Sequence, residues 1–87
     1  MSFLHSESHL DRGDVAVVTL DSQANVMLMD DSNFSAYRSG SLFRYSGGLA
    51  KRSPVRLVAP QSGHWNVVID LGGYSGTVRA GVSFLRN

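Results

Sequence analysis

Apolar and polar residues alternate along much of this 87-residue chain, which is the period of β-strands that bury one face. The clearest alternation lies in residues 54–71, PVRLVAPQSGHWNVVIDL, where two such runs flank Pro60-Gln61-Ser62-Gly63. Proline and glycine favour a turn there, so the stretch predicts an antiparallel hairpin at the centre of the fold. The side chains predicted to face the core are Val55, Leu57, Ala59, Trp65, Val67, Ile69 and Leu71.

Other runs have the apolar, β-branched composition of strands. They are residues 2–7, 15–20, 24–29 and 78–84. The runs 15–20 and 24–29 are apolar at both odd- and even-numbered positions, that is, on both faces of the strand. Their short separation predicts a second antiparallel hairpin. Residues 40–48 fit either a loop or a brief edge strand, and the glycines of residues 72–76 favour a loose turn.

The two-residue period stops at residue 30. Asp31 or Ser32 can accept hydrogen bonds from the first turn of a helix, and Gly40 is a typical helix stop. The sequence therefore predicts a short helix over residues 31–39.

A second apolar surface is predicted on the strand faces that point away from the core, at Val58, Val68 and Leu85. The helix can cover that surface through Phe34 and Tyr37, which share one helical face. A surface left without such a cover would favour self-association.

The spacing of the elements decides the fold class. Parallel strands need crossovers of a dozen or more residues, and only the segment 30–48 is long enough for one. We expect a single all-β domain over residues 1–87, an antiparallel, jelly-roll-like β-sandwich of 6–8 short strands with one helical insertion near residues 31–39.

Composition limits the possible metal sites, cross-links and cellular location of the protein. The chain has no cysteine, which excludes disulfides and thiolate metal sites. No apolar run approaches the roughly 20 residues that span a bilayer, and the N-terminal sequence MSFLHSESHL lacks the order of a signal peptide. We expect a cytoplasmic location and no membrane contact.

Charge is unevenly distributed. Six of the seven acidic residues lie in residues 1–31, whereas residues 33–69 carry only basic charges: Arg38, Arg44, Lys51, Arg52 and Arg56. The two segments can mix on a solvated surface, or the basic segment can bind an anionic partner. A pI of about 8.2 disfavours nucleic acid, since dedicated nucleic-acid domains usually exceed a pI of about 9.

Catalytic and metal chemistry has weak support. Parity directs His64 outward, where a solvated histidine is the ordinary interpretation. Asp70 shares that parity, but six residues along a strand place it roughly 20 Å from His64, too far for one catalytic site. A metal site made by His5, His9 and His64 is disfavoured because no simple spacing makes the three imidazoles converge. We expect no catalytic residues, metal or cofactor.

Four blocks of the chain carry a family resemblance: GDVAVVTL, ANVMLMDDSNFSAYRSG, RYSGGLAKRSPVRL and PQSGHWNVVIDLGGYSGTVR. Together they resemble the bacterial family known as domain of unknown function 1883. The resemblance implies a small β-sandwich, found alone or joined to a TIR domain, and it implies no activity. The stretch from Pro60 to Trp65 is also similar to a hairpin of small jelly-roll domains that accompany secreted peptidases.

These observations favour a non-enzymatic interaction or ligand-sensing module. Its basic surface would bind a protein or a small anionic ligand through Arg38, Arg44, Tyr45, Lys51, Arg52 and His64. One alternative is a small hydrolase or lyase that uses His64. Another is a purely structural subunit of a homo-oligomer.

Overall fold

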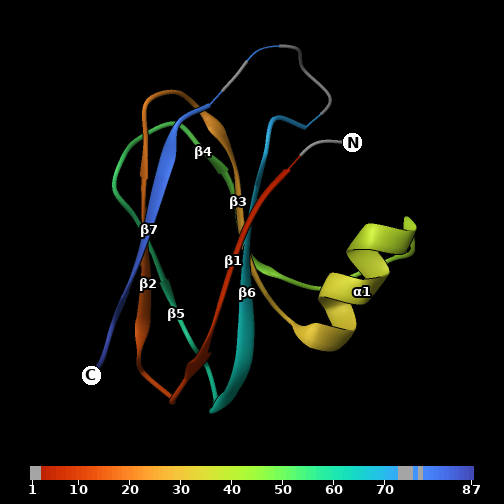
Figure 1. Ribbon diagram of the computed structural model, residues 1–87, viewed down its shortest axis with the longest axis vertical. Helices are drawn as coiled ribbons and strands as arrows, with labels where there is room; N and C mark the ends of the chain where they lie inside the picture. Colours follow the sequence, from red (N-terminus) through yellow and green to blue (C-terminus); the bar gives the residue numbers. More distant parts are fainter. Residues whose placement is uncertain (1–2, 73–75, 77) are drawn as a thin grey trace.

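Two β-sheets and one helix make up the fold in this computed structural model, which describes residues 3–72, 76 and 78–87. The elements are β1 (Phe3–Leu10), β2 (Val15–Leu20), β3 (Ala24–Asp30), α1 (Asp31–Ser39), β4 (Ser46–Ala50), β5 (Val55–Val58), β6 (Gly63–Asp70) and β7 (Ala80–Leu85). The four-stranded sheet has the order β1-β6-β3-β4, and the three-stranded sheet has the order β5-β2-β7 (Figure 1). The antiparallel sandwich with one helical insertion, predicted from the sequence, is confirmed.

The core lies between the two sheets and contains the inward side chains that alternation predicts. Its buried members are Leu10, Ala16, Val18, Ala24, Val26, Leu28, Leu57, Ala59, Trp65, Val67 and Ile69. Trp65 is only 7% exposed, and its indole Nε1 donates a hydrogen bond to the Gln61 carbonyl at 3.0 Å. The indole therefore fills the core and fixes the turn that precedes β6.

The two predicted hairpins are wrong, because the strands of each lie in different sheets. β5 pairs with β2, whereas β6 pairs with β1 and β3, so residues 59–62 form an arch between sheets. β2 and β3 are likewise in separate sheets. Alternation identifies the buried face of a strand but not its neighbour, and inward side chains can meet across a core as well as within one sheet.

The helix begins and ends at capping residues. Asp30 is the N-cap: its backbone is extended, at φ −77° and ψ 176°, and its carboxylate accepts the Asn33 N–H at 2.8 Å. The predicted caps, Asp31 and Ser32, were therefore one or two residues late, because the last residue of β3 already serves. Gly40 closes the helix in the left-handed conformation, at φ 79°.

α1 covers the outer face of the four-stranded sheet, on the side away from β2, β5 and β7 (Figure 1). Tyr37 packs there with Met27, Met29 and Val68, all buried, and Phe34 and Phe3 lie at the margin of this second cluster. The helix therefore covers Val68, as the sequence predicts. The rest of the predicted second surface has no such cover, since Val58 and Leu85 lie on the other sheet with exposed fractions of 55% and 47%.

A buried hydrogen-bond network attaches the helix to the sheet. The Tyr37 hydroxyl donates to Asp70 at 2.6 Å, and the second oxygen of that carboxylate accepts from the Asn25 side chain and the Gly72 N–H, each at 2.9 Å. Burial, together with the adjacent carboxylate, raises the pKa of Tyr37. Both oxygens of Asp70 therefore accept hydrogen bonds, one from the helix and the other from β3 and the backbone that follows β6.

Two predicted segments, residues 40–48 and 72–76, are left to compare with the structure. Residues 41–45 lead into the edge strand β4, so the segment 40–48 contains both a loop and the start of a strand. Gly47 is required there, because its φ is 114° and a Cβ would collide with the Val26 carbonyl. Residues 73–75 of the predicted glycine turn lie outside the described residues. No helix in the described part of the chain has the length and apolar character to cross a membrane.

Trp65→Ala tests the core assignment. We expect the free energy of unfolding to fall by about 3–5 kcal/mol, because the substitution leaves a large cavity between the sheets. Leu42→Ala is the control: Leu42 is 99% exposed, so its loss should change stability by less than about 0.5 kcal/mol. Urea denaturation followed by far-ultraviolet circular dichroism measures the stability of both variants. Tryptophan fluorescence is unsuitable, because Trp65→Ala removes the sole tryptophan. Equal stability of the two variants would contradict the assignment.

Candidate functional site

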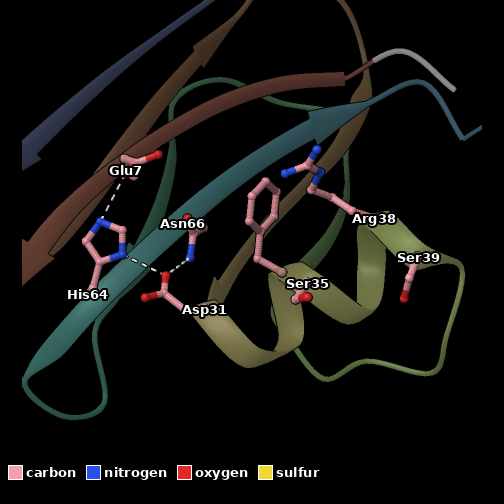
Figure 2. Close-up of a pocket in the computed structure, with 8 residues that line it drawn as sticks. Glu7, Asp31, Ser35, Arg38, Ser39, His64 and Asn66 are labelled. Atoms are coloured by element: carbon pink, nitrogen blue, oxygen red, sulfur yellow. Dashed lines mark hydrogen bonds and ion pairs between the residues drawn. The ribbon is translucent and has the colours of Figure 1, made fainter.

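An open groove of about 530 Å³ lies between α1 and the outer face of β1 and β6. Figure 2 shows the side chains that line it: Glu7, Asp31, Phe34, Ser35, Arg38, Ser39, His64 and Asn66. Those from the helix are spaced by three and four residues from its first residue to its last, so they form one helical face. The adjoining face of the helix holds Tyr37 against the sheet, and Phe34 lies at the margin of that contact.

His64 lies between two carboxylates at one end of the groove (Figure 2). Its Nδ1 is 2.6 Å from Asp31 Oδ1, and its Nε2 is 3.3 Å from Glu7 Oε1. Ionised carboxylates only accept hydrogen bonds, so this arrangement is satisfied when both ring nitrogens carry a proton. The hydrogen bond that His64 donates to Asp31, together with the charges of both carboxylates, raises the pKa of His64, and burial opposes this shift. The geometry favours an imidazolium.

Asn66 joins this ion-pair cluster to the sheet. It is 1% exposed, and its Nδ2 donates to Asp31 Oδ1 at 2.8 Å and to the Met29 carbonyl at 3.3 Å. Its Oδ1 lies 2.9 Å from His5 Nε2, which donates when it carries the ring proton. Hydrogen bonds from Asn66, and then from His64, lower the pKa of Asp31. Asp31 is therefore held ionised at the first turn of the helix, where a negative charge is favourable.

The other end of the groove carries a positive charge. The Phe34 ring stacks on the His5 ring with centroids 4.2 Å apart, and the Arg38 guanidinium carbon is 5.8 Å from the Phe34 centroid. Arg38 is exposed, and no carboxylate in the described part of the chain forms an ion pair with it. The groove therefore runs from a paired acidic cluster to an arginine with no acidic partner.

The six residues predicted to bind an anionic partner fall into three places. Arg38 and His64 line the groove. Arg44 and Tyr45 lie in the segment 41–45, where the Arg44 N–H donates to Asn33 Oδ1 at 2.7 Å and the Tyr45 ring packs on Phe43. Lys51 and Arg52 line a small hollow of about 100 Å³ with residues 20–23. The basic segment is continuous in the sequence but does not form one surface.

The three histidines share the outer face of β1 and β6. Glu7 is a partner of two of them, with its carboxylate 3.6 Å from His5 Nε2 and 3.3 Å from His64 Nε2, and their other partners differ. His9 lies 3.1 Å from Asp11, His5 contacts Asn66, and His64 contacts Asp31. Asp70, the proposed catalytic partner of His64, lies instead beneath the helix with Tyr37. Among the described residues, no group of three or more histidine, cysteine, aspartate or glutamate side chains is placed to hold a metal ion.

Sequence reasoning missed Glu7 and Asp31 as the partners of His64. The pairing of His9 opposite His64 and of Glu7 opposite Asn66 makes Glu7 a diagonal neighbour of His64. The alternation of β1 could have placed Glu7 on the outward face of its strand. Alternation does not show which strand lies beside β1, so it could not identify His64 as the partner. Asp31 reaches His64 only because the helix folds back over β6.

The fold and the groove define a small β-sandwich module with a helix over one sheet and a polar groove beside that helix. The whole chain, residues 1–87, matches the family described as Domain of unknown function (DUF1883), and the chain belongs to that family. The resemblance seen in the sequence is thereby confirmed. No curated protein and no solved structure matches the chain.

The ion-pair cluster predicts a defined pH dependence. Because folding raises the pKa of His64, its contribution to stability is complete below about 6.5, the ordinary value, and is lost as the pH rises through the raised pKa. Because folding lowers the pKa of Asp31, its contribution is complete above about 3.8 and is lost as the pH falls through the lowered pKa. The cluster therefore stabilises the fold most between these two ordinary values.

Asp31→Asn tests the cluster directly. The substitution removes the main cause of the shift, so we expect the pKa of His64 to move down towards its ordinary value. Titration of the histidine ring signals by NMR measures it, with Asp21→Asn as the control, since Asp21 lies outside the groove. An unchanged His64 titration in Asp31→Asn would show that the contact is absent in solution.

Proposed function

We propose that this protein is a non-enzymatic interaction module whose groove receives an acidic group of a partner protein at Arg38. The observation that carries the proposal is an exposed guanidinium at the end of a groove, near the Phe34 ring and without an acidic partner among the described residues. A guanidinium presents several N–H donors in a planar fork that fits a carboxylate. The hydroxyl side chains of Ser35 and Ser39 line the same wall.

The contacts of His64 support binding rather than catalysis. A general base needs a free ring nitrogen within hydrogen-bond distance of its substrate. Both nitrogens of His64 face carboxylates instead, and the raised pKa favours the protonated form. Asp70 accepts hydrogen bonds from Tyr37, Asn25 and the Gly72 backbone, which leaves it a structural role.

The charges of the groove favour a protein partner over a small polyanion or nucleic acid. Arg38 attracts an acidic group, but Glu7 and Asp31 at the other end carry one more charge than the imidazolium between them neutralises. A polyanion would meet repulsion there. A polypeptide can place a carboxylate at Arg38 and a hydrogen-bond donor at Glu7, and so satisfies both ends of the groove.

Arg38→Gln tests the proposal with a defined probe. The probe is a capped peptide of alternating threonine and glutamate, and its lysine analogue is the negative control. We expect Arg38→Gln to weaken binding of the glutamate peptide about tenfold, which corresponds to about 1.4 kcal/mol, because a charge-assisted hydrogen bond is lost. Chemical-shift titration of backbone amides measures the affinity and locates the site.

Two further variants serve as controls for this experiment. Arg56→Gln removes the same charge from the three-stranded sheet and should leave binding unchanged. The double change Lys51→Gln with Arg52→Gln tests the other basic cluster. Loss of binding in the double variant, with none in Arg38→Gln, would refute the groove as the site.

A further inference from the structure

We propose that the acidic partner of the groove is a second copy of this chain, which adds its β1 antiparallel to β1 and places its Glu7 at Arg38. This inference rests on the proposed function, because it names the partner of the same site. It is carried by the exposed edge of β1, by the charge pattern of that strand and by the position of Arg38.

β1 is the longest of the four edge strands in the described residues, β1, β4, β5 and β7. An edge strand presents unpaired backbone N–H and C=O groups, which proteins usually shield with short length, proline, lysine or distortion. β5 is four residues long and lies between Pro54 and Pro60. β4 is five residues long and contains two glycines of positive φ, Gly47 and Gly48, and β7 is six residues long. β1 is eight residues long, FLHSESHL, with neither proline nor lysine, and it pairs only with β6.

The side chains of β1, together with the contact of Arg86 at the His9 carbonyl, favour one symmetric register. A two-fold axis at Glu7 would oppose Glu7 to Glu7 of the second copy, and like charges directly opposite each other destabilise a sheet. An axis at His5 would oppose two imidazoles. An axis at Ser8 opposes Glu7 to His9 of the second copy, but it uses the His9 carbonyl, which already accepts a hydrogen bond from Arg86. An axis at Ser6 opposes His5 to Glu7 of the second copy and Glu7 to its His5, so each acidic side chain meets a hydrogen-bond donor in addition to the His5 and His64 rings of its own chain. β1 is therefore complementary to itself in the Ser6-centred register.

This register brings the second copy to the unpaired arginine. Arg38 lies near the Phe34 ring, and that ring stacks on His5. Glu7 of the second copy would stand opposite His5, where directly opposed Cβ atoms are about 4.5–5.5 Å apart. The incoming carboxylate would then lie on the same face of the extended sheet as α1, beside Arg38. Each copy would complete the groove of the other, as a two-fold interface requires.

One contact sets the limit of the paired region. Arg86 donates from its guanidinium to the His9 carbonyl at 2.7 Å, so that backbone acceptor is already occupied. Pairing in the Ser6-centred register would therefore be continuous from His5 to Glu7 and weaker towards His9. The prediction is a reversible dimer rather than an obligate one.

A charge-exchange experiment tests the interface. Sedimentation equilibrium over a wide concentration range measures the molar mass of the wild-type protein and of Glu7→Arg and Arg38→Glu. We expect the wild type to dimerise and each single variant to become monomeric, because each places like charges at the interface. A mixture of the two single variants should restore a dimer, since every pair between unlike copies is then of opposite charge. Circular dichroism and thermal unfolding confirm that the variants remain folded.

The controls separate this inference from the proposed function. Arg56→Glu changes charge on the other sheet and should leave the dimer intact, as should Val58→Ser with Leu85→Ser. A dimer that dissociates only in the valine and leucine variant would overturn the inference, and so would a mixture that stays monomeric. A monomeric wild type that still binds the glutamate peptide through Arg38 would overturn the dimer and leave the proposed function standing.

Discussion

Burial of β6 on both faces is the constraint on which the rest of the structure depends. Trp65, Val67 and Ile69 face the other sheet, while Asn66 and Val68 lie beneath α1, and all five are buried. A strand without a solvent face needs neighbours on both edges and cover on both sides. β1 and β3 supply the neighbours, the three-stranded sheet covers one face and the helix covers the other. The helix is therefore part of the core, and the groove beside it is a consequence of how β6 is covered.

The sequence predicted the elements well because their signals are local. Alternation identified the strands and the buried side of Trp65, and Gly40 located the end of the helix. Strand pairing could not be predicted in the same way. Pro60 and Gly63 indicate that the chain reverses, but they do not distinguish a hairpin from an arch between sheets. In this fold only β3 and β4, of all strands consecutive in the described chain, pair with each other, and α1 lies between them.

The site was harder to predict than the fold because its residues meet through the topology. His64 and Arg38 were recognised from the sequence, but their surroundings were not. Glu7 belongs to a strand that pairs with β6 from the far end of the chain, and Asp31 arrives with the helix. The basic segment misled in the opposite direction: sequence proximity suggested one surface, whereas the turns at residues 41–45 and 51–54 distribute its charges over separate places.

The same burial of β6 explains why the groove and the open edge adjoin each other. Once β6 is central, β1 becomes the edge of its sheet, and the helix that covers β6 stands beside that edge. The outward residues of β1 then have two roles, since Glu7 contacts His64 within the chain and also faces the open edge. A helix beside an unshielded strand edge is an arrangement that accepts an additional strand, with backbone pairing for affinity and alternate side chains for selectivity. In the dimer that we propose, Arg38 would supply that selectivity, because it lines the groove and forms no ion pair with a carboxylate in the described part of the chain.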